Sequence, residues 1–352
     1  MNALAPWLRE PLHRALDALA GERLAHALLV CGPMHIGKRA FGDALAQAML
    51  CRERVDGAAC GHCRSCGLFA ARTPVDPALT RPDGSLVHPH GRSSHPDFRV
   101  VSFEMNEKAR PPKMFGVITI EQMRELGGWF ALTAQRGGAQ VALIEPANAM
   151  NENASNALLK TLEEPMQDRY LLLLCESPMQ LSATIRSRCQ RIDLQPPAAA
   201  QGIAWLQERG HGQELAQAAL AAARGHPGLA AHWIDGGLLA LRDSVRADLS
   251  AVASGRAQPL VVAAAWLADE QAEQRLAFAA DLAVDLHAKA VGAGDVPAAS
   301  KAMRAGGAPD LPKLSAWFDA VNRTRALLRT PIRSDLAVAG LLRDWRIAVS
   351  MR

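Results

Sequence analysis

The sequence predicts an α/β fold in which a parallel sheet with helices on both faces is followed by an all-helical region. Two observations in the first 194 residues predict the sheet. Short apolar runs alternate with helical patterns there, and a glycine-containing loop separates the first run from the helix after it. A third observation predicts where the sheet ends: beyond Gln-Pro-Pro at 195–197 the chain is rich in Ala, Leu and Gln and shows no strand pattern.

The elements of the sheet region follow one another in a regular order. A buried parallel strand is apolar on both faces, whereas a helix that covers it is apolar on one, so the two patterns can be told apart. We expect strands at 26–30, 98–103, 140–144 and 170–175, and helices at 8–20, 37–50, 119–130 and 151–163. Residues 71–98 contain many Pro, Gly and Ser residues and predict a loop.

Length and composition exclude several classes of protein. The 352 residues are enough for two or three domains, and 49% hydrophobic with 21% charged residues excludes a disordered chain. The formal charge of +4 is too small to indicate nucleic-acid binding by itself. The longest uncharged apolar stretch, 260–268, is far shorter than the roughly 20 residues of a membrane helix. Because Arg9 and Glu10 lie where an export signal has its apolar core, we expect a cytoplasmic protein.

The segment from Gly32 to Lys38, Gly-Pro-Met-His-Ile-Gly-Lys, has the features of a phosphate-binding loop. It follows an expected strand and opens an expected helix, so backbone N–H groups and the helix N-terminus can surround phosphate oxygens while Lys38 reaches the outer phosphates. Gly32, Gly37 and Lys38 are therefore the candidate cofactor-binding residues. The alternative is an ordinary glycine turn between a strand and a helix.

Two departures from a working phosphate loop predict that ATP is not hydrolysed. Arg39 stands where a Ser or Thr hydroxyl would ligate the magnesium ion. Glu145 at the end of a later strand is followed by Pro146, which has no group to orient an attacking water. The site is thus interpreted as derived from an ATPase. Nucleotide binding stays open, since Arg39 could either pair with a phosphate or occupy its place.

Four of the seven cysteines predict a metal site. Cys51, Cys60, Cys63 and Cys66 offer four thiolates within sixteen residues, which is enough for a closed tetrahedral site, and zinc is the expected structural ion. An iron–sulfur cluster is the sharper rival, but the Cys-Pro that continues such motifs in ferredoxins is missing. Free buried cysteines are the other alternative.

Several other residues are interpreted as structural. Four histidines are expected to be solvated rather than ligands: His62, His88, His90 and His95. Two cysteines are expected to pack within strands: Cys31 and Cys175. Three tryptophans are expected in the core or at subunit contacts: Trp266, Trp317 and Trp345. Three charged residues are expected on the exposed face of the helix at 151–163: Lys160, Glu163 and Glu164.

Two further strings point to a family. They are Asn156-Ala-Leu-Leu-Lys-Thr-Leu-Glu-Glu-Pro165 and Thr184-Ile-Arg-Ser-Arg-Cys189. After the phosphate loop and the cysteine cluster, in that order, they resemble the bacterial clamp-loader subunits of DNA polymerase III over roughly residues 8–235. The resemblance implies an AAA+ P-loop domain over 1–194 with the zinc module inserted at 51–66. It also implies a helical lid over 195–237 and an all-helical oligomerisation domain, or collar, over 238–352.

The departures favour one type of subunit within this family. The ATPase subunit, gamma or tau, keeps the hydroxyl residue, an acidic pair and a lid arginine, whereas this chain has Arg39, Pro146 and, at the lid position, Gly228. It therefore resembles the non-hydrolysing type, delta prime. An active gamma or tau ATPase is the alternative, and a zinc-dependent DNA-binding module is a second one. That module would favour a basic stripe, which this cluster with its interspersed Glu53 and Asp56 does not form.

The resemblance also implies a catalytic role for Arg188 in the Ser-Arg-Cys motif. It would reach the outer phosphate of ATP on the neighbouring subunit, and a solvated loop arginine is the alternative. The isolated chain would not be an enzyme but a component of the DNA-directed DNA polymerase holoenzyme. The implied partners are gamma or tau and delta subunits and, through the complex, the sliding clamp and primed DNA, without a membrane. The motifs leave open which surfaces touch clamp or DNA and what residues 71–98 do.

Overall fold

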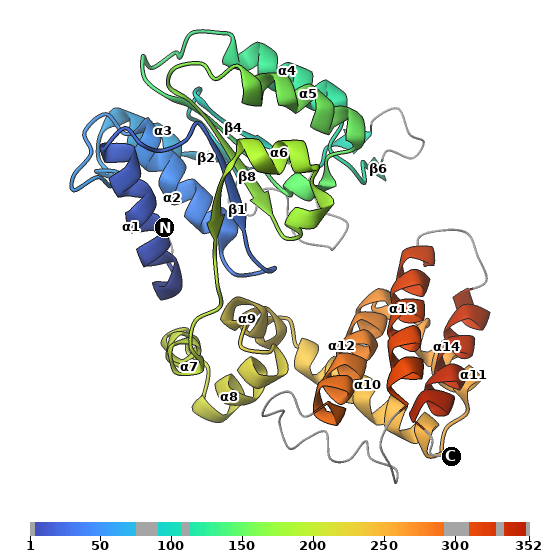
Figure 1. Cartoon of the computed structure of the whole chain (residues 1–352). Helices are drawn as coiled ribbons and strands as arrows, with labels where there is room; N and C mark the ends of the chain where they lie inside the picture. The colour runs from blue at the N-terminus through green and yellow to red at the C-terminus, as the bar shows by residue number, and fades with distance from the viewer. Residues whose placement is uncertain (1–3, 75–90, 107–112, 292–309, 329–333, 350–352) are drawn as a thin grey trace. The chain divides into compact units, whose positions relative to one another are not determined.

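The computed structural model describes residues 4–74, 91–106, 113–291, 310–328 and 334–349 (Figure 1). The chain divides into two compact units. The first comprises Met1–Arg209 with His226–Leu229, and the second Gly210–Gly225 with Ala230–Arg352. This division falls within the segment predicted as a lid, 195–237, whose extent as a domain stays a prediction.

The first unit is built on a five-stranded sheet in the order β4-β7-β8-β1-β9, with every pairing parallel. Four strands confirm the predicted ones: β1 (Ala27–Cys31), β4 (Phe98–Val101), β7 (Gln140–Ile144) and β8 (Arg169–Cys175). The fifth, β9 (Gln190–Asp193), was not predicted. It is an edge strand with a single apolar residue, Ile192, so it lacks the apolar run by which the buried strands are recognised.

Helices cover both faces of the sheet because successive strand residues point to opposite sides. Leu28 and Val30 of β1 share a core with α1 (Pro6–Ala20) and α2 (Lys38–Leu50). Leu29 and Cys31 share the opposite core with three other helices: α4 (Ile120–Phe130), α5 (Glu152–Glu163) and α6 (Ala183–Arg188). Figure 1 shows α1 and α2 on one side of the strands and α4 and α5 on the other.

Short elements surround this core. Helix α3 (Arg64–Ala70) lies in the cysteine segment, and α7 (Ala199–Glu208) follows the sheet. Two antiparallel pairs consist of two-residue strands, β2 (Arg72–Thr73) with β3 (Arg92–Ser93) and β5 (Met105–Asn106) with β6 (Lys113–Met114). The segment predicted as a loop, 71–98, thus contains β2 and β3, and its residues 75–90 lie outside the described part.

The C-terminal half is helical throughout its described residues, as predicted. After α8 (Gln213–Ala222) and α9 (Pro227–Asp235) come five helices: α10 (Leu238–Ala253), α11 (Pro259–Trp266), α12 (Ala272–Ala290), α13 (Leu311–Leu327) and α14 (Ser334–Val349). Helix α14 packs on α10, α11 and α13. Trp266, Trp317 and Trp345 are buried between these helices, which confirms the core assignment. None of the helices within the described ranges has both the length and the apolar character needed to cross a membrane.

Candidate functional site

The phosphate loop lies at the carboxyl edge of the sheet, between β1 and α2. Parallel strands end at the same edge, which is where open α/β sheets bind their ligands. Two carboxylates therefore reach the loop from neighbouring strands, Glu145 after β7 and Glu176 after β8. Gly37 turns the loop into the helix with φ of 101°, a left-handed conformation that a residue without Cβ adopts at little cost.

Lys38 is engaged by its own loop. Its ammonium donates hydrogen bonds of 2.8 Å to the carbonyl oxygens of Gly32 and Pro33, and it lies 3.6 Å from a carboxylate oxygen of Glu176. The side chain is only 7% exposed. Burial lowers the pKa of Lys38, and the charge of Glu176 offsets part of that effect. The structure thus brings the three predicted loop residues, Gly32, Gly37 and Lys38, together.

Arg39 pairs with the carboxylate that precedes the second departure, Pro146. Its guanidinium lies 3.0 Å from Asp43 and 3.1 Å from Glu145, and all three side chains are largely buried. Burial opposes the charge, but the two carboxylates outweigh it and raise the pKa of Arg39. Glu145 therefore faces a fixed cation. Sequence reasoning missed Asp43, although its spacing of four residues from Arg39 on a helix was a usable signal.

The start of α9 lies directly against the phosphate loop. A Cβ atom added at Gly228 would lie 1.8 Å from the carbonyl oxygen of His35, far inside van der Waals contact. His35 itself has φ of 58°, so the loop presents this carbonyl from an uncommon backbone conformation. The sequence predicts Gly228 at the place of the family's lid arginine, and this packing leaves no space there for any side chain.

The four predicted cysteines converge on one point. Their sulfur atoms all lie within 4.8 Å of one another, with separations of 3.6 Å for Cys51–Cys60 and 3.9 Å for Cys51–Cys63 and Cys60–Cys66. A tetrahedral zinc ion with Zn–S bonds of roughly 2.3 Å places its sulfurs about 3.8 Å apart. The cluster therefore fits a tetrahedral ion such as zinc without rearrangement.

Backbone groups support negative charge on these sulfurs. The N–H groups of Cys60, Cys63 and Cys66 point at the sulfurs of Cys51, Cys60 and Cys63, at 3.3 to 3.5 Å. Burial disfavours ionised thiols and raises the pKa of Cys66 to about 12. At Cys63 the hydrogen bonds, led by the Cys66 N–H, outweigh burial and lower the pKa to about 6. At least one thiolate is thus available before a cation would ionise the others.

His95 is buried, so the prediction that it is solvated was wrong. It is 2% exposed, and its Nε2 lies 2.7 Å from the Ser65 hydroxyl, which donates to the carbonyl of Leu50. Its Nδ1 accepts from the N–H of Asp97. Together these partners assign the proton to Nε2. A loop-like composition did not reveal this role, because the partner Ser65 lies between two of the cysteines, 30 residues away. His62 is exposed as predicted, and His88 and His90 lie outside the described residues.

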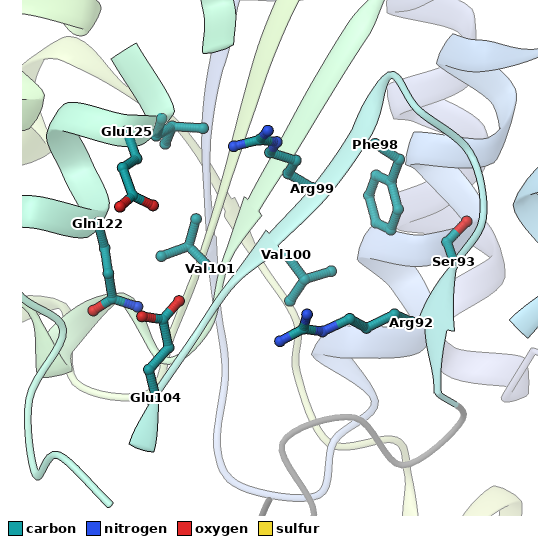
Figure 2. Close-up of a pocket in the computed structure, with 10 residues that line it drawn as sticks. Arg92, Ser93, Phe98, Arg99, Val100, Val101, Glu104, Gln122 and Glu125 are labelled. Carbon is teal, nitrogen blue, oxygen red and sulfur yellow. The ribbon is translucent and has the colours of Figure 1, made fainter. Parts of the chain in front are cut away.

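A separate cavity of about 240 Å³ lies beside the edge strand β4 and contains none of the predicted site residues. Figure 2 shows Arg92 and Arg99 facing Glu104, Gln122 and Glu125. Burial raises the pKa of Glu104. The opposite charges of this cavity balance one another, and its strand β4 is separated from β1 by β7 and β8.

Arg188 is the last residue of α6, so the alternative of a solvated loop arginine is wrong about its place in the chain. Its side chain is 36% exposed and forms an ion pair of 2.7 Å with Glu163, the last residue of α5. It also donates a hydrogen bond of 3.2 Å to the carbonyl oxygen of Thr184. Arg188 is thus a surface cation at the end of a helix, and it belongs to a different element from the phosphate loop.

Comparisons with known proteins agree with the motifs. The family model for "DNA polymerase III, delta subunit" matches residues 9–198. The DNA polymerase III subunit delta prime of Pseudomonas aeruginosa is 40% identical over 56% of this chain and 52% of its own length, so this match spans about half of that relative. The subunit delta prime of Escherichia coli is 31% identical over 83% of this chain and 78% of its own length.

One solved structure is also similar, at low sequence identity. The gamma subunit-related protein of Thermotoga maritima covers 97% of this chain and 99% of its own, with 13% identity and a TM-score of 0.44. The family assignment depends on the sequence matches, since one family model covers more than half of the chain and a 31% identical relative matches over most of both lengths. The chain therefore belongs to the family of DNA polymerase III delta prime clamp-loader subunits.

Proposed function

We propose that this chain is a non-hydrolysing subunit of the DNA polymerase III clamp loader, which opens the sliding clamp and places it on primed DNA. The ion pair of Arg39 with Glu145 carries this proposal, because it joins the position of the magnesium-binding hydroxyl in a working ATPase to the carboxylate that could otherwise approach the metal. A guanidinium cannot ligate a cation, a carboxylate paired with it is not free to bind one, and Pro146 has no group to orient water. Binding of nucleotide by this chain is not required for the role.

Hydrolysis by the isolated chain tests this part of the proposal. We expect no ATP turnover above background from the purified chain. Arg39→Thr alone should not restore it, since Pro146 still provides no group to orient water. Phosphate release, measured with and without the clamp-loader partners, is the readout. Robust turnover by the isolated chain that disappears in Lys38→Ala would instead support an active gamma or tau ATPase.

We propose a catalytic role in trans for Arg188. Its guanidinium is partly exposed at a helix end and belongs to a different element from the chain's own phosphate loop, which leaves its charge open to a neighbouring subunit. There it would offset the charge that develops on the outer phosphate of the neighbouring subunit's ATP. Arginine suits this task because it stays charged and presents a planar fork of donors.

Substitution of Arg188 tests the role in trans. Arg188→Ala should leave folding and assembly intact, because a surface ion pair contributes only about 0–1 kcal/mol. Turnover of ATP by the reconstituted complex during clamp loading should nevertheless fall. The decrease should be smaller than the roughly 10³- to 10⁵-fold effect of an arginine that acts in trans on a single ATP site, because only one of several ATP sites loses its arginine. The substitution Arg188→Lys should restore little of this turnover. The control Arg191→Ala removes the same charge from β9 and should leave turnover unchanged.

The remaining features support an assembly role. We propose that the cysteine module holds one structural zinc ion, that residues 195–237 act as the lid and that residues 238–352 form the collar. The partners would be gamma or tau and delta subunits, acting together in the cytoplasm. The separate helical core of the second unit supports the collar assignment, because it gives the chain a second domain that carries no site residue.

A further inference from the structure

Arg188 is held by its own chain. One terminal nitrogen pairs with Glu163 at 2.7 Å, and the other donates to the Thr184 carbonyl at 3.2 Å. The two side chains of the pair come from the ends of adjacent helices, α5 and α6, and these helices pack in the same core. The position of Glu163 relative to Arg188 is therefore set by rigid elements rather than by a loop.

These two nitrogens are the ones that a phosphate would need. An arginine can recognise phosphate through parallel N–H donors of its two terminal nitrogens, and here Glu163 and the Thr184 carbonyl each take a donor of one of these nitrogens, so a phosphate that binds end-on competes with both. A phosphate that binds Arg188 end-on thus competes with Glu163 for the guanidinium. The exposure of both side chains, 36% and 49%, keeps the pair weak enough for this exchange.

We propose that Glu163 is a latch for Arg188: it holds the guanidinium on the chain's own surface until the outer phosphate of the neighbouring subunit's ATP displaces it. This inference rests on the proposed role of Arg188 in trans. Glu163 touches neither ATP nor the reacting atoms, so it is a positioning residue. Once the outer phosphate has left, the guanidinium loses its competing anion and returns to Glu163.

A latch of this kind changes the concentration of ATP that is needed and leaves the maximal rate unchanged. At low ATP only the unlatched fraction of Arg188 is ready to bind, which weakens the apparent affinity by that fraction. At saturating ATP the phosphate has already displaced Glu163. Loss of the latch should therefore lower KM without altering kcat, as expected when ground state and transition state are affected equally.

The test uses the complete complex with clamp and primed DNA, assembled with wild-type chain, Glu163→Gln, Arg188→Ala or both substitutions. The matched control is Glu164→Gln, which removes the same charge from the next, exposed residue. KM is compared for the part of the turnover that Arg188→Ala removes. We expect Glu163→Gln to lower this KM about two- to fivefold, which is the fold-change that corresponds to the free energy of an exposed ion pair. The double variant should equal Arg188→Ala, because the latch acts only through that residue.

Three results would overturn the latch: an unchanged or raised KM in Glu163→Gln, the same decrease in Glu164→Gln, or the same decrease in the Arg188→Ala background. Failure of the underlying function looks different. If Arg188→Ala alone leaves turnover unchanged, the role of Arg188 in trans is wrong, and the latch has nothing to regulate.

Discussion

Single residues carry the proposal that this chain does not hydrolyse ATP. Arg39 places a long cation where a small hydroxyl residue is needed, and two largely buried carboxylates from different elements compensate its charge. Removing Arg39 would leave Asp43 and Glu145 largely buried without their cation. The fold therefore depends on the arginine at position 39. A single reversion at position 39 therefore changes the electrostatics of the site without restoring its chemistry.

His95 provides a prediction at the same scale. His95→Leu removes the hydrogen bonds to Ser65 and Asp97 and should lower the free energy of unfolding by about 1–3 kcal/mol at pH 7.5. Burial lowers the pKa of His95, so below its ordinary value of about 6.5 the unfolded chain binds a proton that the folded chain does not. The stabilising effect of His95 is thus complete above that pH and is lost as the pH falls below it.

Urea unfolding of both proteins at pH 7.5 and 5.5 checks this expectation. The difference between wild type and His95→Leu should shrink at the lower pH. The control His13→Leu alters an exposed histidine and should change stability by no more than roughly 0.5 kcal/mol. A difference that grows on acidification would contradict the neutral, hydrogen-bonded form of His95.

At the scale of elements, the proposed zinc ion gives a prediction for the cysteine module. Helix α3 has seven residues, and Cys63 caps its start by accepting from the N–H of Cys66. Such a short helix is not stable alone. We expect one zinc per chain in protein purified without added metal, and Cys66→Ser should lose it and expose the module to proteolysis. Cys189→Ser, which removes a cysteine outside the cluster, should retain the metal. An iron and sulfide signal would contradict the zinc assignment.

The start of α9 gives a second prediction at this scale. Gly228→Ala places a methyl group on the His35 carbonyl, so helix or loop must move, and we expect a lower Tm. Gly340→Ala in α14 is the matched control, because its Cβ meets no atom within 4 Å. It should raise stability by about 0.5–1 kcal/mol through helix propensity. Equal effects of the two substitutions in thermal unfolding would show that α9 does not pack on the loop.

At the scale of the whole molecule, the chain should act as one member of a mixed complex. Combined with gamma and delta subunits, it should form a complex that holds one copy of this chain, and native mass spectrometry measures that composition. Arg188→Ala should assemble equally well, since the proposed finger contributes charge rather than packing. A complex without this chain, or one with several copies, would contradict the proposed place in the assembly.

The sequence by itself determined the family, the parallel sheet, the helical C-terminal half and the residues of the phosphate loop and cysteine cluster. Each of these is a local pattern: an apolar run, a glycine turn or closely spaced cysteines. Only the tertiary structure decided that Arg39 meets Glu145, that His95 anchors the cysteine segment, that β9 completes the sheet and that Glu163 holds Arg188. These contacts join residues that are distant in the chain. Strand order and helix packing decide which residues meet, and no periodic pattern in the sequence indicates these pairings.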